Sequence, residues 1–482
     1  MAPALDMRFK RWYFADKAGV VYTAPAPEKF ALFFTKFGVY TEFGIEPILI
    51  GNFFQQFYSI ADALIVGRFV GKEAFAAIDA TATLLRLPVG FFIGVANGAT
   101  ILVSQAYGAR DAKWVSGLVH TAVASSLLFG LIFSALCYVT APWLLGLMAV
   151  PADIFDTALI YDEILFAGMV LPLIFNIGCG ILRAVGDSRR PFCYLVFACL
   201  TNIALDLLFV IGLGWGAAGA AVATVVAQGL SALLVIVALC RYQDVCRLTL
   251  RAMRINRRYL LSILRTGLPI GLQGSTYYLA NVLIHARINM FGTGVIAAVA
   301  VFNKLDLLVW ILVEAMTISV STFVGQNYGA HQLSRVRRSV DLCISTGLLI
   351  TAALSVALYF SGEALSLCLV DDAETARLAG EIMRFMAPWY FTAVWAEILP
   401  GAIRATGETL APTLLTMISP FTLRILWILL VAPFFPSIYW VLVVFPLSWG
   451  VTAALFVVYY HRYKRRRLMA DLLSLQGQEG GA

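Results

Sequence analysis

Residues 180–191 read GILRAVGDSRRP and residues 401–412 read GAIRATGETLAP, so the second segment repeats the first at an offset of 221. A second pair, SQAYGAR at 104–110 and GQNYGAH at 325–331, matches at the same offset. Two separate matches at one fixed spacing predict an internal duplication of the chain. The identical pairs include Gln105/Gln326, Tyr107/Tyr328, Gly108/Gly329, Arg183/Arg404 and Gly186/Gly407.

The composition is that of a membrane protein. Hydrophobic residues make up 61% of the 482 residues and charged residues 13%, whereas soluble domains average about 45–50% and about 25%. Apolar stretches recur from residue 43 to residue 460, each long enough to cross the hydrocarbon core of a bilayer. We therefore predict an all-α polytopic membrane protein with twelve spans, at 43–66, 76–105, 115–140, 156–182, 191–211, 217–240, 260–291, 296–324, 338–360, 376–403, 412–432 and 439–460.

The duplication divides these spans into two halves of six. An even number of spans gives both halves the same orientation, so they are expected to form two lobes related by a pseudo-twofold axis along the membrane normal. We expect an N-terminal cytoplasmic tail (1–40), an N-lobe (41–240), a cytoplasmic linker (241–259), a C-lobe (260–460) and a basic C-terminal tail (461–482). Transporters built this way bind their substrates near the membrane midplane.

Arginine and lysine gather in alternate loops, at 110–113, 183–190, 241–258, 335–338, 404 and 462–467, while the other loops carry only Arg68, Lys72 and Arg377. This distribution follows the positive-inside rule and predicts that both termini are cytoplasmic. It also accounts for the net charge of +7 without nucleic-acid binding. The first 38 residues show no apolar core of a cleavable signal peptide, and the eight cysteines show no metal-ligand or disulfide pattern.

The repeated motifs have features of helix ends. Arg183 and Arg404 can neutralise the negative end of a helix dipole, and Gly186 and Gly407 can adopt the left-handed turn that stops a helix. These loops are interpreted as helix-ending turns and gate hinges, with a substrate site as the alternative. The expected gate residues are Gln105, Tyr107, Gly108, Arg183, Gly186, Gln326, Tyr328, Gly329, Arg404 and Gly407.

Several polar residues interrupt the spans of the first half. Asn202 and Asp206 lie four residues apart, on one face of the fifth span. A carboxylate there costs about 2.5–3.5 kcal/mol on insertion scales, and intramembrane acids usually mark ion pathways. Asp62, Asn176 and Thr224 lie in other spans of the same half, and together the five residues offer oxygen ligands for a proton or a sodium ion. The alternative is that each residue separately bridges two helices.

The second half does not copy this set. Asn176 corresponds to Glu397, and the eighth span carries Asp306, Trp310 and Glu314 at helical spacing. Acids beside aromatic rings suit a lipophilic cation, so these four residues are a candidate substrate site. The alternative is structural ion pairing of Lys304 with Asp306 or of Glu397 with Arg404.

The twelve-span plan, the paired loop motifs and the set Asp62, Asn176, Asn202, Asp206 and Thr224 resemble the MATE (multidrug and toxic compound extrusion) transporters, in particular the DinF-like branch. The resemblance implies that Asp62 and Asp206 bind the coupling ion, as metal ligands if that ion is sodium. It implies that Asn176, Asn202 and Thr224 complete the shell. Residues 260–302 contain no Asp or Glu, so the chain departs from the NorM-like branch in lacking an acid in span seven.

From these features we expect a secondary active antiporter that exports small amphipathic, cationic drugs or toxins in exchange for H⁺ or Na⁺ by alternating access. We expect a monomer in a bacterial plasma (inner) membrane, with the lipid bilayer and a small-molecule substrate as partners and no cofactor beyond the coupling ion. One alternative is a flippase for a lipid-linked precursor, which would need a cavity rich in arginine and lysine. The other is a membrane enzyme, which the four dispersed histidines do not favour.

Overall fold

The computed structural model describes the backbone of residues 13–15, 21–23, 45–148 and 150–463. Within these ranges, the side chains of residues 13–15, 21–23, 45–46, 57–64, 72–73, 75–76, 79–83, 86–87, 153, 278–279 and 463 are not described. The side chain of Asp62 therefore lies outside the described residues, although its backbone forms part of a helix.

Helices dominate the described chain. The first half contains α2 (Ile45–Phe69), α3 (Lys72–Gly108), α4 (Ala112–Leu147), α5 (Ala152–Ala167), α6 (Val170–Ala184), α7 (Arg189–Asp206), the π-helical turn η2 (Leu207–Gly212) and α8 (Gly216–Cys240). A short 3₁₀ turn, η3 (Leu250–Ala252), follows in the linker. Before α2, strands β1 (Tyr13–Ala15) and β2 (Val21–Thr23) pair antiparallel, with Tyr13 opposite Thr23.

The second half contains α9 (Arg257–Ile288), η4 (Asn289–Phe291), α10 (Thr293–Gly329), α11 (Leu333–Leu367), α12 (Ala373–Met386), η5 (Ala387–Trp389) and α13 (Tyr390–Ala405). It continues with α14 (Leu410–Thr416), the π-helical turn η6 (Met417–Thr422), α15 (Leu423–Leu430), η7 (Ala432–Phe434), α16 (Ile438–Leu442) and α17 (Val444–Tyr463). Joining the segments that continue one another gives six helical rods in each half of the described chain.

Nine of the twelve described rods have the length and composition of membrane spans. Eight described helices are long and apolar enough to cross a bilayer, and α5 and α6 form a ninth span bent by 43°. Predicted span 156–182 is therefore broken, because Pro172 lacks the N–H that a continuous helix would use at this point. Helices α3 and α10 extend past predicted spans 76–105 and 296–324, since they have 37 residues each. Such helices reach about 55 Å, well beyond hydrocarbon about 30 Å thick.

The backbone confirms the duplication. Gly186 and Gly407 both have a positive φ, of 91° and 92°, at the ends of α6 and α13. Arg110 and His331, which follow α3 and α10, both have φ of 57°. The predicted left-handed helix stops are therefore confirmed, at positions separated by 221 residues in both cases.

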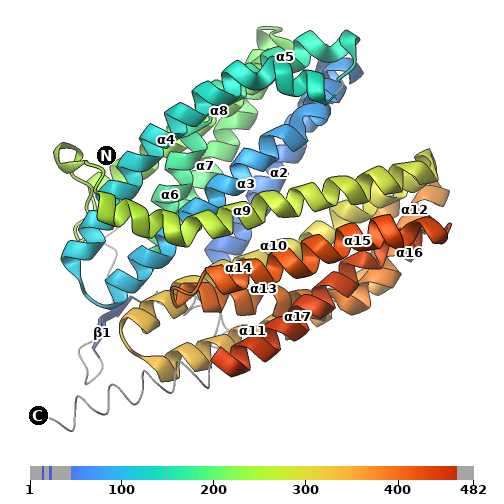
Figure 1. Cartoon of the computed structure of the whole chain (residues 1–482). Coiled ribbons are helices and arrows are strands. Elements are labelled where there is room, and N and C mark those ends of the chain that lie inside the picture. The colour runs from blue at the N-terminus through green and yellow to red at the C-terminus, as the bar shows by residue number, and fades with distance from the viewer. Residues whose placement is uncertain (1–12, 16–20, 24–44, 149, 464–482) are drawn as a thin grey trace, which may run out of the picture.

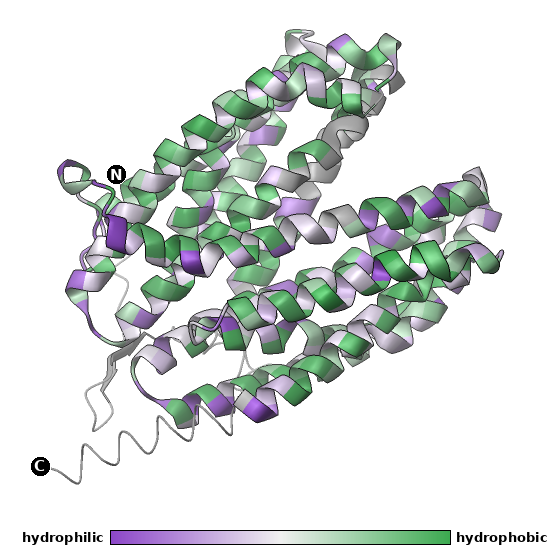
Figure 2. Ribbon diagram, viewed as in Figure 1, coloured by the Kyte–Doolittle hydropathy of each residue, from purple (hydrophilic) through white to green (hydrophobic). Residues whose placement is uncertain are grey.

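The outer surface is apolar, as a bilayer requires. Large hydrophobic side chains are exposed along α4, including Leu131, Leu136, Val139 and Trp143. Figure 2 shows hydrophobic residues over most of the helix surfaces, including those that face away from the neighbouring helices. Soluble proteins rarely expose so much apolar surface to water. These faces are therefore expected to contact lipid.

Two groups of helices form the two lobes, and they diverge toward one end of the molecule (Figure 1). Separate hydrophobic cores lie in the first and second halves. Helix α9 lies between the groups and packs along α3 of the N-lobe. Small residues permit this approach, because a Cβ added to Gly94 would lie 2.3 Å from the nitrogen of Gly271, and one added to Gly98 would lie 2.3 Å from the Cα of Gly267.

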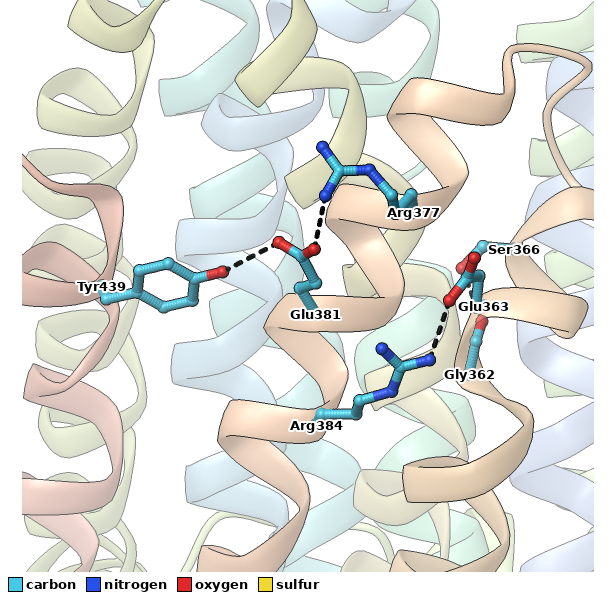
Figure 3. Close-up of polar contacts among 7 residues, drawn as sticks. All are labelled: Gly362, Glu363, Ser366, Arg377, Glu381, Arg384 and Tyr439. Atoms are coloured by element: carbon cyan, nitrogen blue, oxygen red, sulfur yellow. Dashed lines mark hydrogen bonds and ion pairs between the residues drawn. The ribbon is translucent and has the colours of Figure 1, made fainter.

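The loops at 109–111, 185–188, 241–256, 330–332 and 406–409 connect the ends of rods that share one end of the molecule, which we name the basic end for its arginine-rich segments. At the opposite end, one ion pair joins α11 and α12, another lies within α12, and a tyrosine hydroxyl joins α16 to α12 (Figure 3). Arg384 Nη2 contacts Glu363 Oε2 at 2.7 Å, Arg377 Nη1 contacts Glu381 Oε1 at 2.6 Å, and Tyr439 donates to Glu381. These pairs are partly exposed, so each contributes only about 0–1 kcal/mol.

Candidate ion-coupling and substrate sites

A cavity of about 360 Å³ lies inside the N-lobe, lined by α2, α3, α5, α6, α7 and α8. Three of the five predicted ion-site residues, Asn176, Asn202 and Thr224, line it. The other polar lining residues are Asn52, Gln55, Arg183, Ser188, Gln228 and Ser231. The N-lobe cavity is therefore rich in oxygen acceptors, and Arg183 is the arginine among its lining residues.

Asn202 and Thr224 contact each other in the wall of the N-lobe cavity. The Asn202 amide Nδ2 donates to Thr224 Oγ1 at 3.3 Å, and the two residues are only 1% and 6% exposed. The other amide atom, Oδ1 of Asn202, is buried and accepts no hydrogen bond from the described residues. An unsatisfied buried acceptor costs about 1–3 kcal/mol, so this oxygen is suited to a cation or a proton donor.

Asp206 follows Asn202 by one helical turn and is fully buried. It is the last residue of α7, directly before the π-helical turn η2. Such π-helical insertions are frequent at functional sites, because they rotate the side chains that follow and break the regular backbone ladder. The predicted common face of Asn202 and Asp206 is thus placed where the fifth rod changes its helical type.

Asn176 lies in α6, where its Nδ2 donates to the carbonyl oxygen of Pro172 at 2.8 Å. This bond fixes the amide and leaves Oδ1 as the atom that the residue can offer to a ligand. Asp62 belongs to α2, which packs against α7, but its side chain lies outside the described residues. The five-residue ion site remains a prediction.

Sequence reasoning missed several residues of this lobe. Asn52 and Gln55 lie three residues apart on α2, and Gln228 follows Thr224 by one turn on α8; all three line the N-lobe cavity. Asp162 on α5 is fully buried. The rule that marks acids inside apolar spans applies to Asp162 as it does to Asp206, and helical spacing from Thr224 would have identified Gln228.

A second, smaller cavity of about 40 Å³ lies in the C-lobe. Its polar lining residues are Gln273, Thr276, Tyr277, Glu397, Thr416, Arg424 and Thr452, and Trp449 completes one wall. Of the four predicted substrate residues, Glu397 is the one that lines this C-lobe cavity. Arg404 lies nearby and donates from Nη2 to Gln273 Oε1 at 2.6 Å, so its hydrogen bond goes to Gln273 and not to Glu397.

Asp306 forms a closed cluster with aromatic residues. Trp310 Nε1 donates to Asp306 Oδ2 at 3.0 Å, and the Tyr390 hydroxyl donates to Oδ1. Trp449 packs against both Trp310 and Tyr390. Both carboxylate oxygens are thus satisfied by neutral donors rather than by Lys304, which is exposed.

Glu314 is exposed on α10, and the charge of Arg183 from the other lobe acts on it. An acid of the C-lobe thus lies within electrostatic range of a base of the N-lobe. The attraction between Glu314 and Arg183 weakens as the lobes move apart. Either charge could then interact with a ligand that lies between the lobes.

The two lobes are joined at the basic end by reciprocal hydrogen bonds. Gln105 Nε2 of α3 donates to the carbonyl oxygen of Ala405 at 2.7 Å, and Gln326 Nε2 of α10 donates to that of Ala184 at 2.7 Å. Donors and acceptors are both 221 residues apart, so each repeated motif binds the other half's helix end. We name this pair of bonds the interlobe latch.

Glycine at 108 and 329 allows the interlobe latch to form. A Cβ added to Gly108 would lie 1.9 Å from the carbonyl oxygen of Gln326, and one added to Gly329 would lie 2.0 Å from that of Gln105. These distances are far below van der Waals contact, so a side chain here would separate the lobes. The predicted gate residue Tyr107 instead donates to Asp244 Oδ2 of the linker, at 3.2 Å.

Two duplicated six-helix halves, with a polar cavity in a lobe and a latched contact at one end, define a membrane transporter of the parallel-repeat class. The profile of the MatE family matches the chain twice, over residues 47–208 and 269–430, once in each half. The chain therefore belongs to the MatE family, the MATE transporters. Its assignment to the DinF-like branch stays a prediction.

Curated relatives include the probable multidrug resistance protein YoeA of Bacillus subtilis, 27% identical over 379 residues, covering 77% of this chain and 82% of the relative. The FAD transporter of Shewanella oneidensis is 27% identical over 338 residues, covering 68% and 73%. Among solved structures, a MOP-superfamily transporter from Pyrococcus furiosus has a TM-score of 0.80 at 20% identity, covering 89% of this chain and 95% of its own. At this identity the structural match establishes the fold.

Proposed function

We propose that this chain is a secondary active antiporter that exports small amphipathic, cationic compounds in exchange for H⁺ or Na⁺. The chain belongs to the MATE transporters, and its relatives include proteins named for multidrug resistance and multidrug export. The observation that carries the finer proposal is the orphaned Oδ1 of Asn202, one turn from the buried carboxyl of Asp206.

The coupling ion is proposed to bind at Asn202, Asp206, Thr224 and Asn176, with Asp62. Three of these residues line one cavity, and their oxygens provide ligands that suit a proton or a hard cation. Each unit charge that crosses the membrane contributes about 2.3 kcal/mol per 100 mV. An ion entering the N-lobe site can therefore drive a substrate out against its gradient.

Alternating access is proposed to run through the interlobe latch. The arginine-rich loops favour a cytoplasmic location of the basic end and of both termini. Gln105 and Gln326 are bonded across the lobes and hold this end together. With the basic end on the cytoplasmic side, this arrangement is proposed to be the outward-facing state. Breaking both bonds is required before the lobes can separate on the cytoplasmic side.

For the substrate, the exposed Glu314 of α10 supplies a negative charge. A positive drug that reaches the space between the lobes would be attracted to this acid. Export of an anionic flavin nucleotide is the second candidate, since one relative is an FAD transporter and Arg183 lines the N-lobe cavity with Phe175 and Phe192.

The function is tested with purified protein in proteoliposomes, under a proton gradient and a sodium gradient imposed separately. The assay follows ethidium, FAD and a fluorescent lipid-linked sugar in parallel. Ethidium movement that requires one of the two gradients supports the proposal and names the ion. FAD movement alone would replace the cationic substrate class, and lipid translocation without either gradient would replace antiport by the flippase alternative.

A further inference from the structure

The two cavities are repeat counterparts. At the offset of 221, residues that line the N-lobe cavity correspond to residues that line the C-lobe cavity. The matched pairs are Asn52/Gln273, Gln55/Thr276, Phe175/Ala396, Asn176/Glu397, Leu195/Thr416, Cys199/Pro420, Gln228/Trp449 and Ser231/Thr452. The same pocket therefore exists in both lobes, but its volume falls from about 360 Å³ to about 40 Å³.

Arg424 of α15 lies in the wall of the smaller cavity and is only 1% exposed. Its Nε donates to Ser448 Oγ at 3.1 Å, and its Nη1 donates to Asn281 Oδ1 at 3.1 Å. The rings of Tyr277 and Phe445 both lie 4.9 Å from the guanidinium carbon. The charged group is thus held by two aromatic faces and two neutral oxygens, an arrangement that proteins use to bind organic cations.

The repeat relates the surroundings of Arg424 to the predicted ion site of the N-lobe. Phe445 is the counterpart of Thr224, and Arg424 is the counterpart of Ile203, the residue after Asn202. The guanidinium therefore occupies the C-lobe counterpart of the place where Asn202 and Thr224 meet in the N-lobe. Glu397, the counterpart of Asn176, lines the same cavity, where the charge of Arg404 and, more weakly, that of Arg424 act on it.

We propose that the C-lobe cavity is a cation-binding pocket whose ligand is the protein's own Arg424 guanidinium. The guanidinium is held by the ring faces of Tyr277 and Phe445 and by the oxygens of Ser448 and Asn281, and Glu397 in the cavity wall supplies an opposing charge. Because the tethered cation fills the site, exchangeable cations are confined to the N-lobe. This last consequence rests on the proposed function, whereas the occupancy of the pocket does not.

The test removes the arginine side chain in Arg424→Ala and adds free guanidinium, a cation of the same shape as the group that was lost. Purified Arg424→Ala is compared with the wild type by thermal unfolding in detergent, with millimolar guanidinium or methylguanidinium chloride. We expect Arg424→Ala to unfold at a lower temperature and to regain several degrees on adding guanidinium, with saturation. Urea, which has the same shape without the charge, and KCl at equal ionic strength should not restore it.

Arg384→Ala provides the matched control, because Arg384 is half-exposed and pairs with Glu363 at the surface. Guanidinium should not raise its unfolding temperature. Equal effects of urea, KCl and guanidinium on Arg424→Ala, or an equal effect on Arg384→Ala, would overturn the proposal. So would a wild type stabilised by phosphate or pyrophosphate in an Arg424-dependent way, because the cavity would then be an anion site.

If Arg424→Ala does not fold, two milder variants test whether the site stabilises a cation at position 424. Arg424→Lys retains a cation, and Arg424→Gln retains the approximate length without charge, so the lysine variant should unfold at the higher temperature. The loss of stability in Arg424→Gln should also be smaller in a Glu397→Gln background, where the partly buried residue 397 carries no charge. Equal unfolding temperatures of the Lys and Gln variants would contradict the tethered cation. All these readouts measure folding, so they stand apart from any failure of ion-coupled transport.

Discussion

At the scale of single residues, the N-lobe site combines groups that are costly to bury. Asp206 is fully buried, and Asn202 leaves an acceptor oxygen unbonded among the described residues. Stability alone would favour apolar residues at both positions, because burying a carboxyl group or an unbonded amide oxygen costs free energy. In the proposed function, the coupling ion that binds these oxygens offsets that cost.

Thr224→Val tests the neutral part of this set. Valine keeps the shape of threonine but removes the hydroxyl that accepts from Asn202. Loss of one neutral ligand of about 1–2 kcal/mol corresponds to an increase of about 5-fold to 30-fold in the half-saturating ion concentration. Thr224→Ser, which retains the hydroxyl, should stay close to the wild type. An ion dependence that is the same in the Val and Ser variants would exclude Thr224 from the ion shell.

The sequence was sufficient to predict part of this site and not the rest. Helical spacing places Asn202 and Asp206 on one face, and the apolar context marks them as unusual. Which helices turn their polar faces toward each other depends on packing, which periodicity does not encode. For this reason Asn52, Gln55 and Gln228 escaped prediction, and Asp306 was expected to be a substrate residue although Trp310 and Tyr390 occupy its oxygens.

At the scale of helices, the interlobe latch joins the ends of α3 and α10 to those of α13 and α6. Each bond has a net value of about 0.5–1.5 kcal/mol. Together they can shift a two-state equilibrium by about 5-fold to 150-fold, since every 1.4 kcal/mol is tenfold.

Gln105→Leu combined with Gln326→Leu should therefore favour separation of the lobes at the basic end. The measurement is the distance between spin labels at Ala109 and Ala330, a repeat pair at that end. We expect a longer-distance population to grow in the double variant. Gln332→Leu, in the neighbouring loop, is the matched control and should leave the distribution unchanged. An unaltered distribution in the double variant would show that the latch does not hold the lobes.

Gly108→Ala should have the same effect through steric exclusion. Its Cβ would meet the carbonyl oxygen of Gln326 at 1.9 Å, so the closed arrangement cannot form without displacement of α10. The same spin-label distance should lengthen. Gly146→Ala provides the control, because its Cβ would meet nothing within 4 Å. A Gly108→Ala protein with the wild-type distance distribution would contradict the close packing described here.

The elements themselves were largely predictable, because apolar length and helix-stopping glycines mark where rods begin and end. Three features were not predictable. The break between α5 and α6 depends on how Pro172 is accommodated, and the π-helical turns η2 and η6 leave no signature in hydropathy. The contact of α9 with α3 depends on glycine pairs such as Gly94 and Gly271, which meet only after both helices are placed.

At the scale of the whole molecule, two native cysteines test the orientation in the membrane. Cys193 is exposed in the second turn of α7, near the basic end, and Cys368 is exposed after α11 at the opposite end. If the basic end is cytoplasmic, a membrane-impermeant maleimide added to intact cells should label Cys368 and not Cys193. Cys246 in the linker should remain unlabelled even after permeabilisation, because burial raises its thiol pKa to about 12.

The variants Cys193→Ser and Cys368→Ser assign each label to its residue. Labelling of Cys193 from outside, with Cys368 protected until the cells are opened, would reverse the proposed orientation. The positive-inside argument would then fail for this chain, although the fold and the duplication would be unaffected.

The two lobes share one plan but carry different chemistry. The duplication fixes the backbone, as the matching φ angles at residues 186 and 407 show. Side chains at repeat positions diverge: Asn176 in the N-lobe cavity corresponds to Glu397 in the C-lobe cavity. Sequence repetition therefore predicts the architecture of both halves, whereas it does not predict which half binds the ion.

The central claim is that ion flow through the N-lobe drives export. The most direct measurement is substrate-induced H⁺ or Na⁺ flux in proteoliposomes, for the wild type, Asp206→Asn and Asp156→Asn. Asp156 is an exposed acid of α5 and serves as the control. Since contacts to a charged group are worth about 1.5–3 kcal/mol, we predict that Asp206→Asn lowers the flux about 10-fold to 100-fold while Asp156→Asn does not. Full ion flux in Asp206→Asn would contradict the account.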